Sequence, residues 1–180
     1  MYFDRKYTRM EYGLLNGKYQ WTAGRELWAH VKTENGRALL SSHGLAFSTV
    51  AAVETPVIML NDFDCLTRET QVLFITHAEP SGLKCKAQAV AAPIAECKFI
   101  GDSADTLFQA VVTEMWQSHA QEEPMQLNVK RLLLLYPKAN SFAPTEGYLV
   151  EVNGTNYEIV NVHALDPTRW ECEIERRYDL

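Results

Sequence analysis

The C-terminal part of the chain has the most regular alternation of hydrophobic and polar residues. Asn153 and Gly154 lie there between two runs rich in aromatic and β-branched residues. Asn-Gly is favoured in a two-residue type I′ turn because both central residues need a positive φ. The pattern therefore predicts a hairpin in which Val152 faces Thr155. Its apolar face is expected to hold Tyr148, Val150, Val152, Tyr157 and Ile159.

A third strand is expected to follow this hairpin. Residues 169–175 alternate strictly after the turn signal at Asp166 and Pro167, and this alternation puts Trp170, Cys172 and Ile174 on one face. Residues 147–176 thus predict a three-stranded antiparallel meander. The opposite face carries a row of carboxylates, which is typical of a solvated face but could also line an acidic channel or deter edge pairing. The row consists of Glu171, Glu173 and Glu175.

Other segments also have the pattern of strands. Asn16-Gly17 predicts a second two-residue hairpin, in which Leu15 faces Lys18. A third hairpin candidate joins residues 25–32 to residues 37–40. Further strands are expected in residues 47–60, with a bend at Pro56, and in residues 71–76, 83–92, 96–100 and 125–136.

One segment has helical periodicity instead. Asp102 or Ser103 can cap it, and its apolar residues recur with a spacing of about 3.6 residues. These residues are Leu107, Phe108, Val111, Met115 and Trp116. We therefore expect an amphipathic helix at about residues 103–120. The expected fold class is α+β or mainly β, an antiparallel barrel or sandwich with this helix packed on it.

The length of 180 residues is sufficient for one large domain, and a single domain over residues 1–180 is expected. Two β-rich halves, residues 1–100 and 125–180 joined by the helix, are the alternative. Residues 74–80 and 159–167 both lead from a strand through His-Ala to an acid and a proline. Chance can produce so short a match, and a duplicated β unit would also produce it.

Composition and charge exclude several classes of protein. The formal net charge of −6 argues against a protein that grips nucleic acid through a basic surface. The longest apolar run, residues 132–136, is far too short to cross a membrane, so we expect a soluble protein made in the cytoplasm. The four cysteines form no C-x-x-C pair and are expected to be reduced and buried.

Candidate chemistry is sparse. Cys85 lies between two lysines, but neighbouring residues of a strand point to opposite faces, so a buried structural thiol is expected. Ser42 beside His43 lacks the motif of a nucleophile elbow, and the histidines lack metal-ligand spacing. We expect no catalytic residue, no metal and no cofactor. The alternative is a small-molecule-binding barrel or hydrolase that uses Cys85 or His77 in a pocket between helix and sheet.

The C-terminal pattern resembles a known group of proteins. The residues that carry the resemblance are Pro144, Gly147, Val150, Asn153-Gly154, Tyr157-Glu158-Ile159, Val162 and Asp166-Pro167, with residues 25–32 and Asn35-Gly36 near the N-terminus. They resemble segments of the head-tail connector proteins of tailed bacteriophages, the adaptor and stopper group. Residues 59–136 depart from that pattern by making the chain longer, and tail terminators are also similar in architecture.

The resemblance implies a structural virion protein that is not an enzyme. It would form a homo-oligomeric ring at the head-tail (neck) or tail interface and leave a passage for DNA. Its partners would be copies of itself and neighbouring head, neck or tail proteins, and DNA would only pass through the ring. The contacts are expected on the carboxylate row and in the residues after it, which form either a frayed tail or a binding arm. These candidates are Glu171, Glu173, Glu175, Arg176, Arg177 and Tyr178.

Overall fold

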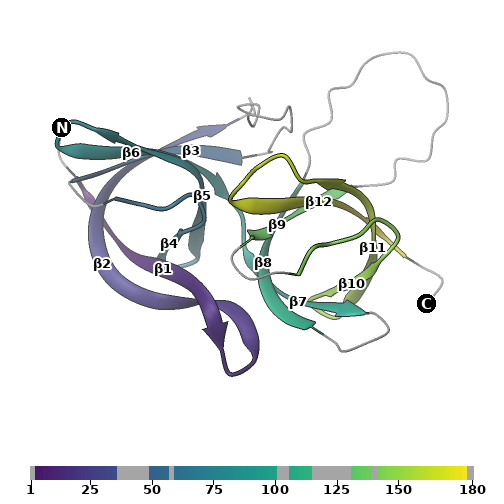
Figure 1. The fold of residues 1–180 in the computed structure, drawn as a ribbon. Helices are drawn as coiled ribbons and strands as arrows, with labels where there is room; N and C mark the ends of the chain where they lie inside the picture. Colours follow the sequence, from purple (N-terminus) through teal and green to yellow (C-terminus); the bar gives the residue numbers. More distant parts are fainter. Residues whose placement is uncertain are drawn as a thin grey trace, which may run out of the picture.

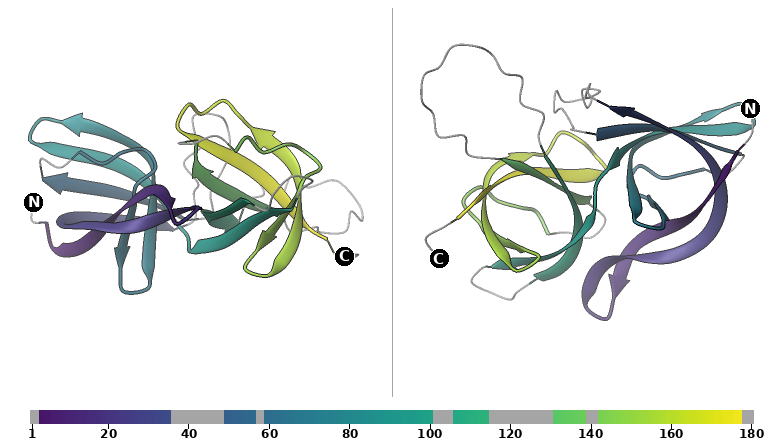
Figure 2. Two further views of the ribbon diagram at one scale, coloured as in Figure 1. Left: turned by 60° about the horizontal axis from the view of Figure 1, so that its bottom comes forward. Right: turned by 180° about the vertical axis from the view of Figure 1, so that it is seen from behind.

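The computed structural model describes residues 3–35, 49–56, 59–100, 106–114, 131–138 and 142–177. In these residues the chain forms one 12-stranded mixed sheet that closes on itself twice. The result is two β-barrels, which lie side by side in all three views (Figures 1 and 2). The fold is therefore all-β in the described residues.

The first barrel is built from six strands, and every pair of neighbours in it is antiparallel. Its order around the barrel is β1-β4-β5-β6-β3-β2, and the pairing of β2 with β1 closes it. The strands are β1 (Arg5–Leu15), β2 (Lys18–Asn35), β3 (Thr49–Pro56), β4 (Cys65–Arg68), β5 (Gln71–Ser81) and β6 (Lys84–Ala91).

The second barrel begins only two residues after β6 ends. Its order is β8-β7-β10-β11-β12-β9, closed by the pairing of β9 with β8, and its neighbours are also antiparallel. The strands are β7 (Ile94–Ile100), β8 (Thr106–Glu114), β9 (Leu132–Pro137), β10 (Leu149–Val152), β11 (Thr155–His163) and β12 (Arg169–Arg176).

The two barrels have the same topology. In each, the first strand pairs with the second and fourth, the third with the second and sixth, and the fifth with the fourth and sixth. The registers also agree: when Thr8 is matched to Lys98, the pairs Thr8–Glu26 and Thr8–Thr67 correspond to Lys98–Leu107 and Lys98–Glu151. The chain is thus a structural duplication of one six-stranded unit.

The two similar phrases in the sequence lie in equivalent parts of the two barrels, but their matching letters do not. The phrases lie on the equivalent strands β5 and β11, and both strands shift register at one position, after Ile75 and after Ile159. In the strand pairings, His77 occupies the position equivalent to Asn161. Aligning the His-Ala letters of the two phrases would instead match His77 with His163. The matching letters are thus two residues out of register, so the duplication does not account for their identity, and chance stays the explanation for it.

Both Asn-Gly hairpins are confirmed. Asn16 and Gly17 have φ of 54° and 79°, and Asn153 and Gly154 have φ of 48° and 81°. Leu15 pairs with Lys18, and Val152 pairs with Thr155. The expected apolar face of the meander lies inside the second barrel, where most of it is buried; Tyr157 and Trp170 are partly buried and Tyr148 is 45% exposed. The candidate hairpin strand at residues 37–40 lies outside the described residues.

We predict that Gly154→Ala destabilises the protein by about 1 kcal/mol or more, because an L-residue at its φ of +81° is strained. Gly13→Ala is the matched control: no atom lies within 4 Å of a Cβ built there, its φ is not positive, and alanine suits a strand at least as well as glycine. Urea unfolding of both variants checks the prediction. Equal stabilities for the two variants would contradict it.

The predicted helix at residues 103–120 is wrong in its described part, because Thr106–Glu114 form strand β8. Phe108 and Ala110 point into the second barrel, whereas Val111 points outward against the first barrel and is also fully buried. A strand that is buried on both faces loses the simple alternation of polar and apolar residues, and its apolar residues then imitate helical spacing. Met115 and Trp116 lie outside the described residues.

The apolar residues form three cores. One fills the first barrel and one fills the second. The third lies between the barrels and joins outward-facing side chains from both of them, among them Trp21, Phe74, Val90, Val111, Leu133 and Leu135. Within the described residues, the strands of the two barrels pair at one position alone, the parallel bridge between Tyr19 and Phe108. Side-chain packing therefore makes up most of the contact between the two barrels.

Candidate functional site

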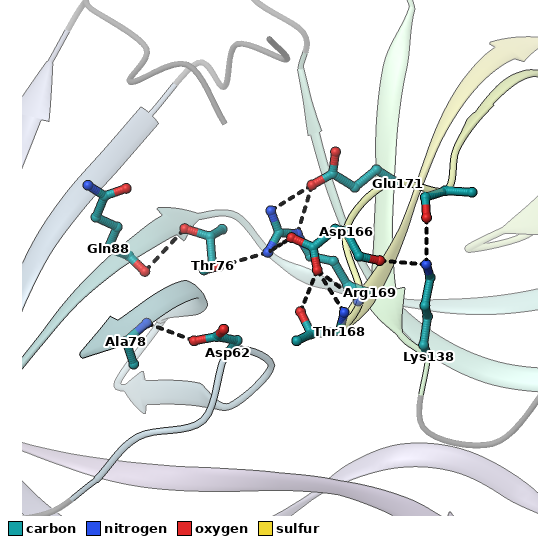
Figure 3. Close-up of polar contacts among 10 residues, drawn as sticks. Asp62, Thr76, Ala78, Gln88, Lys138, Asp166, Thr168, Arg169 and Glu171 are labelled. Atoms are coloured by element: carbon teal, nitrogen blue, oxygen red, sulfur yellow. Dashed lines mark hydrogen bonds and ion pairs between the residues drawn. The ribbon is translucent and has the colours of Figure 1, made fainter. Parts of the chain in front are cut away.

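The carboxylate row on β12 is largely buried, which corrects the expectation of a solvated face. Glu171 is 0% exposed and Glu173 is 6% exposed. Inward-facing residues of β12 belong to the core of the second barrel, so the glutamates point outward as predicted. Glu171 is nevertheless covered, because the outer face of β12 near its start lies against the first barrel (Figure 3).

Arg169, itself only 2% exposed, is the centre of this buried group. Its Nε and Nη2 donate to Glu171 Oε1 at 2.8 and 2.7 Å, and its Nη1 contacts Asp166 Oδ2 at 2.9 Å. The same Nη1 donates to the main-chain oxygen of Thr76, on β5 of the first barrel, at 2.7 Å. Arg169 therefore joins the second barrel to the first through charge-assisted hydrogen bonds.

Asp166 is held in place from several directions. Its Oδ1 accepts hydrogen bonds from the Thr168 hydroxyl at 2.6 Å and from the main-chain N–H groups of Thr168 and Arg169 at 2.8 and 3.3 Å. Burial alone would raise the pKa of Asp166, but these hydrogen bonds and the charge of Arg169 outweigh it and lower the pKa. Asp166 is thus ionised and orients Arg169.

Glu171 has one oxygen that differs from the rest of the group. Among the described residues, no donor lies within hydrogen-bond distance of its Oε2, although the side chain is fully buried. We call Asp166, Arg169, Glu171 and the Thr76 main-chain oxygen the inter-barrel latch. The latch is charged and deeply buried, and its cation is fully engaged by its neighbours.

A second polar group continues along the outer face of β12. Glu173 Oε1 lies 2.7 Å from His163 Nε2 and accepts a hydrogen bond from Asn161 at 3.2 Å. Arg131 contacts Glu173 Oε2 at 3.3 Å and Glu175 Oε1 at 2.5 Å. The hydrogen bond with Glu175 and the nearby carboxylate charges raise the pKa of Arg131. Glu173 and Glu175 are thus neutralised within the second barrel.

The remaining predicted contact residues are not brought into either group. Arg176 and Arg177 are exposed, and Arg177 Nε lies 2.6 Å from Glu158 on β11. Tyr178 lies outside the described residues. The structure therefore separates the five described candidates into a buried latch member, two neutralised glutamates and two exposed arginines.

Sequence reasoning missed the partners of the glutamates. Arg169 stands two residues before Glu171 on the same alternating strand, so their shared face was visible in the sequence. His163 faces Glu171 across the β11–β12 pair, but a bulge in β11 hides this register from the sequence. Nothing in the sequence placed Thr76 near Arg169, because 93 residues separate them.

The first barrel has its own buried ion pair. Arg9 Nε donates to Asp64 Oδ2 at 2.8 Å, and Asp64 Oδ2 also accepts from the main-chain N–H of Asn61 at 2.8 Å. Asp64 is 1% exposed, and burial raises its pKa despite the charge of Arg9. Residues 61–64 form a tight turn, since Asp64 N–H donates back to Asn61 O at 3.1 Å.

These two aspartates give opposite pH dependences. The pKa of Asp166 is lowered on folding, so its contribution to stability is present above the unfolded value of 3.8 and is lost as the pH falls through the folded value. The pKa of Asp64 is raised, so stability declines as the pH rises from 3.8 through its folded value. We expect the cost of Asp166→Asn to shrink toward low pH and that of Asp64→Asn to shrink toward high pH.

Urea unfolding of both variants and the wild type between about pH 3 and about pH 6 checks this pair of predictions. Each variant serves as the control for the other, because both replace a buried aspartate with its isostere. Parallel pH profiles for the two variants would contradict the assignment.

Cys85 and His77, the candidate reactive residues that the structure describes, are not brought together. All four cysteines are buried and free, and burial raises the pKa of Cys97 to about 12 and the pKa of Cys65 and Cys172 well above its usual range. Cys85 is 0% exposed inside the first barrel, whereas His77 is exposed. Ser42 and His43 lie outside the described residues.

Two further features are absent from the described residues. No group of three or more His, Cys, Asp and Glu side chains is placed to hold a metal ion. No helix in that part of the chain is long and apolar enough to cross a membrane. The pocket expected between helix and sheet would have needed residues 106–114 as its helical wall, and they are strand β8.

Comparison with known proteins gives no relative: no protein family, no curated protein and no solved structure matches the chain.

Proposed function

We propose that this protein is a structural subunit that forms a homo-oligomeric ring at the head-tail (neck) or tail interface of a tailed bacteriophage. The ring leaves a passage for DNA, and the subunit contacts neighbouring head, neck or tail proteins. In this role the protein is a building block of the virion and not an enzyme. The resemblance of its C-terminal residues to connector proteins is the starting point for this proposal.

The observation that carries the proposal is how the chain uses its buried charges. Arg169 and its partners bind the two barrels to each other, and Arg131 and His163 bind the glutamates of β12. Charges used in this way make the two barrels one stiff unit. A ring subunit needs such stiffness because small changes in angle between repeated units accumulate around a ring.

The net charge of the chain favours a ring through which DNA passes over a ring that binds DNA tightly. The net charge of −6 repels a phosphate backbone. Three arginines of the second barrel, Arg131, Arg169 and Arg177, are already paired with carboxylates. DNA that has to move through a ring should not be held by many lysine or arginine contacts.

Native mass spectrometry and negative-stain microscopy of the full chain test this proposal. We expect one discrete stoichiometry of more than two copies and ring-shaped particles with a central opening. A protein that stays monomeric at every concentration would overturn the proposal.

A further inference from the structure

The contact between the two barrels uses different faces of the same unit. The first barrel contributes a row of cross-strand neighbours that runs over four strands: Cys65, Phe74, Val90 and Val50. The second barrel contributes a different set, Val111, Leu135 and Leu133 on β8 and β9, with Glu171 and Arg169 on β12. The contact is therefore heterologous, like the contact between subunits of a ring or filament.

Because the barrels share their registers, each contact residue has a counterpart in the other barrel. The pairs Val111–Leu135 and Leu135–Glu171 correspond to His30–Glu54 and Glu54–Lys86 in the first barrel. The pairs Thr113–Leu133 and Leu133–Glu173 correspond to Lys32–Ala52 and Ala52–Gln88. We call the first-barrel set the β3 face: His30, Lys32, Ala52, Glu54, Lys86 and Gln88.

The β3 face is not covered by the second barrel. Lys32, Ala52, Lys86 and Gln88 are exposed, and His30 and Glu54 are partly exposed. At the corresponding positions of the second barrel, Leu133, Leu135 and Glu171 are each 0% exposed. The face is thus exposed in the first barrel, whereas the equivalent positions are buried in the second barrel.

The second barrel likewise presents the counterpart of the row used by the first barrel. In the first barrel, Cys65 pairs with Phe74, and Phe74 pairs with Val90. In the second barrel, the equivalent residues are Leu149, which pairs with Glu158, and Glu175, which also pairs with Glu158. One step beyond the pair Ile174–Leu132, the same register places Arg131 opposite Glu175. We call Leu149, Glu158, Glu175 and Arg131 the β11 face; all four side chains are partly or fully exposed.

We propose that copies of this protein associate by docking the β11 face of one copy on the β3 face of the next, so that the contact inside the chain is repeated between chains. The inference deepens the proposed function, on which it rests, by assigning the surfaces that join neighbouring subunits of the ring. A heterologous internal contact leaves one unused face of each kind on every chain, and a second copy carries the equivalent of the partner face for both.

The charges of the two faces disfavour one alternative arrangement. The β3 face carries Lys32 and Lys86 against one carboxylate, Glu54, whereas Glu158 and Glu175 of the β11 face already pair with Arg177 and Arg131. Docking two β3 faces on each other would bring lysines together, whereas docking a β3 face on a β11 face brings those lysines near carboxylates.

The chemistry also fits a contact that forms after folding. The internal contact is apolar at its centre, which suits surfaces that never meet water in the finished protein. The β3 and β11 faces are mixed in polarity and keep the free subunit soluble until it assembles. Their association is therefore expected to weaken as the salt concentration rises.

Two variants block the two faces separately. Ala52→Arg places a large cation at the counterpart of the fully buried Leu133, and Leu149→Arg places one at the counterpart of the fully buried Cys65. We expect each variant alone to associate with itself about a hundredfold or more weakly than the wild type. Leu14→Arg, at a 58% exposed site near the tip of the β1–β2 hairpin, is the control and should assemble normally. Circular dichroism and thermal melting confirm that each variant is folded.

Mixing the two blocked variants gives the decisive result. Each retains the face that the other has lost, so the equimolar mixture should form a 1:1 dimer by native mass spectrometry and proceed no further. If both variants assemble like the wild type, or if the mixture stays monomeric, the assigned faces are wrong although the ring proposal survives. If one variant forms a dimer with itself, the contact is isologous and the inference is overturned. A wild type that never assembles would overturn both proposals.

Discussion

Replacing Arg169 by methionine is expected to lower the free energy of unfolding by about 3–5 kcal/mol. The substitution leaves Glu171, which is 0% exposed, as an uncompensated buried carboxylate. It also removes the donor to the Thr76 main-chain oxygen on the first barrel. Asp166 keeps most of its hydrogen-bond partners, because Thr168 and the main-chain N–H groups still donate to it. Chemical denaturation of variant and wild type measures the difference.

A second substitution separates the cost of the lone carboxylate from the value of the pair. In Arg169→Met/Glu171→Met both charges are gone, so we expect the double variant to be more stable than Arg169→Met alone. Glu171 Oε2 accepts no hydrogen bond from the described residues, which makes the pair easier to replace by apolar side chains. A double variant whose loss of stability equals the sum of the losses of the two single variants would contradict this account.

The matched control is Arg177→Met on the same segment. Arg177 also pairs with a glutamate, Glu158, but its side chain is 49% exposed. Exposed pairs contribute between about 0 and about 1 kcal/mol, so we expect a change of that size. A loss as large as that of Arg169→Met would show that burial does not set the difference.

Phe74→Ala is expected to lower stability by about 3–5 kcal/mol, because it leaves a cavity in the core between the barrels. Phe74 is 0% exposed, and its ring lies edge-on to that of Trp21, with centroids 5.9 Å apart. Trp21 fluorescence should therefore report the loss directly during urea unfolding. Leu83→Ala, at an 84% exposed position, is the control and should change stability by less than about 0.5 kcal/mol.

The effect of Phe74→Ala also tells which interaction joins the barrels. A loss below about 1 kcal/mol would mean that the latch at Arg169 and the β2–β8 bridge suffice without the apolar core. The expected large loss would place most of the coupling in packed side chains. Hydrogen exchange in both barrels would then show whether the variant lets one barrel open before the other.

Local signals in the sequence were read correctly, and the errors arose where distant segments meet. The two Asn-Gly hairpins depend only on four consecutive residues each, and both were predicted with their register. The Glu171 side chain was expected in water because the strand pattern alone cannot reveal that another barrel covers it. The helix at residues 103–120 failed for the same reason, since Val111 is buried by the first barrel.

The duplication was almost invisible in the sequence. Structurally equivalent positions hold unrelated residues, such as Lys86 and Glu171 or Phe74 and Glu158. The reason is the heterologous contact, because equivalent positions are buried in one barrel and exposed in the other. Pro56 and Pro137, which end the equivalent strands β3 and β9, are among the few residues that both copies share.

The separation of the two barrels along the chain has a consequence for synthesis. Every strand of the first barrel precedes residue 92, so this barrel can close on the ribosome while the second is still being made. Phe74 and Val90 would then face water until Leu133 and Leu135 arrive to cover them. The nascent chain thus passes through a stage with an exposed apolar patch, when it depends most on chaperones and on the speed of translation.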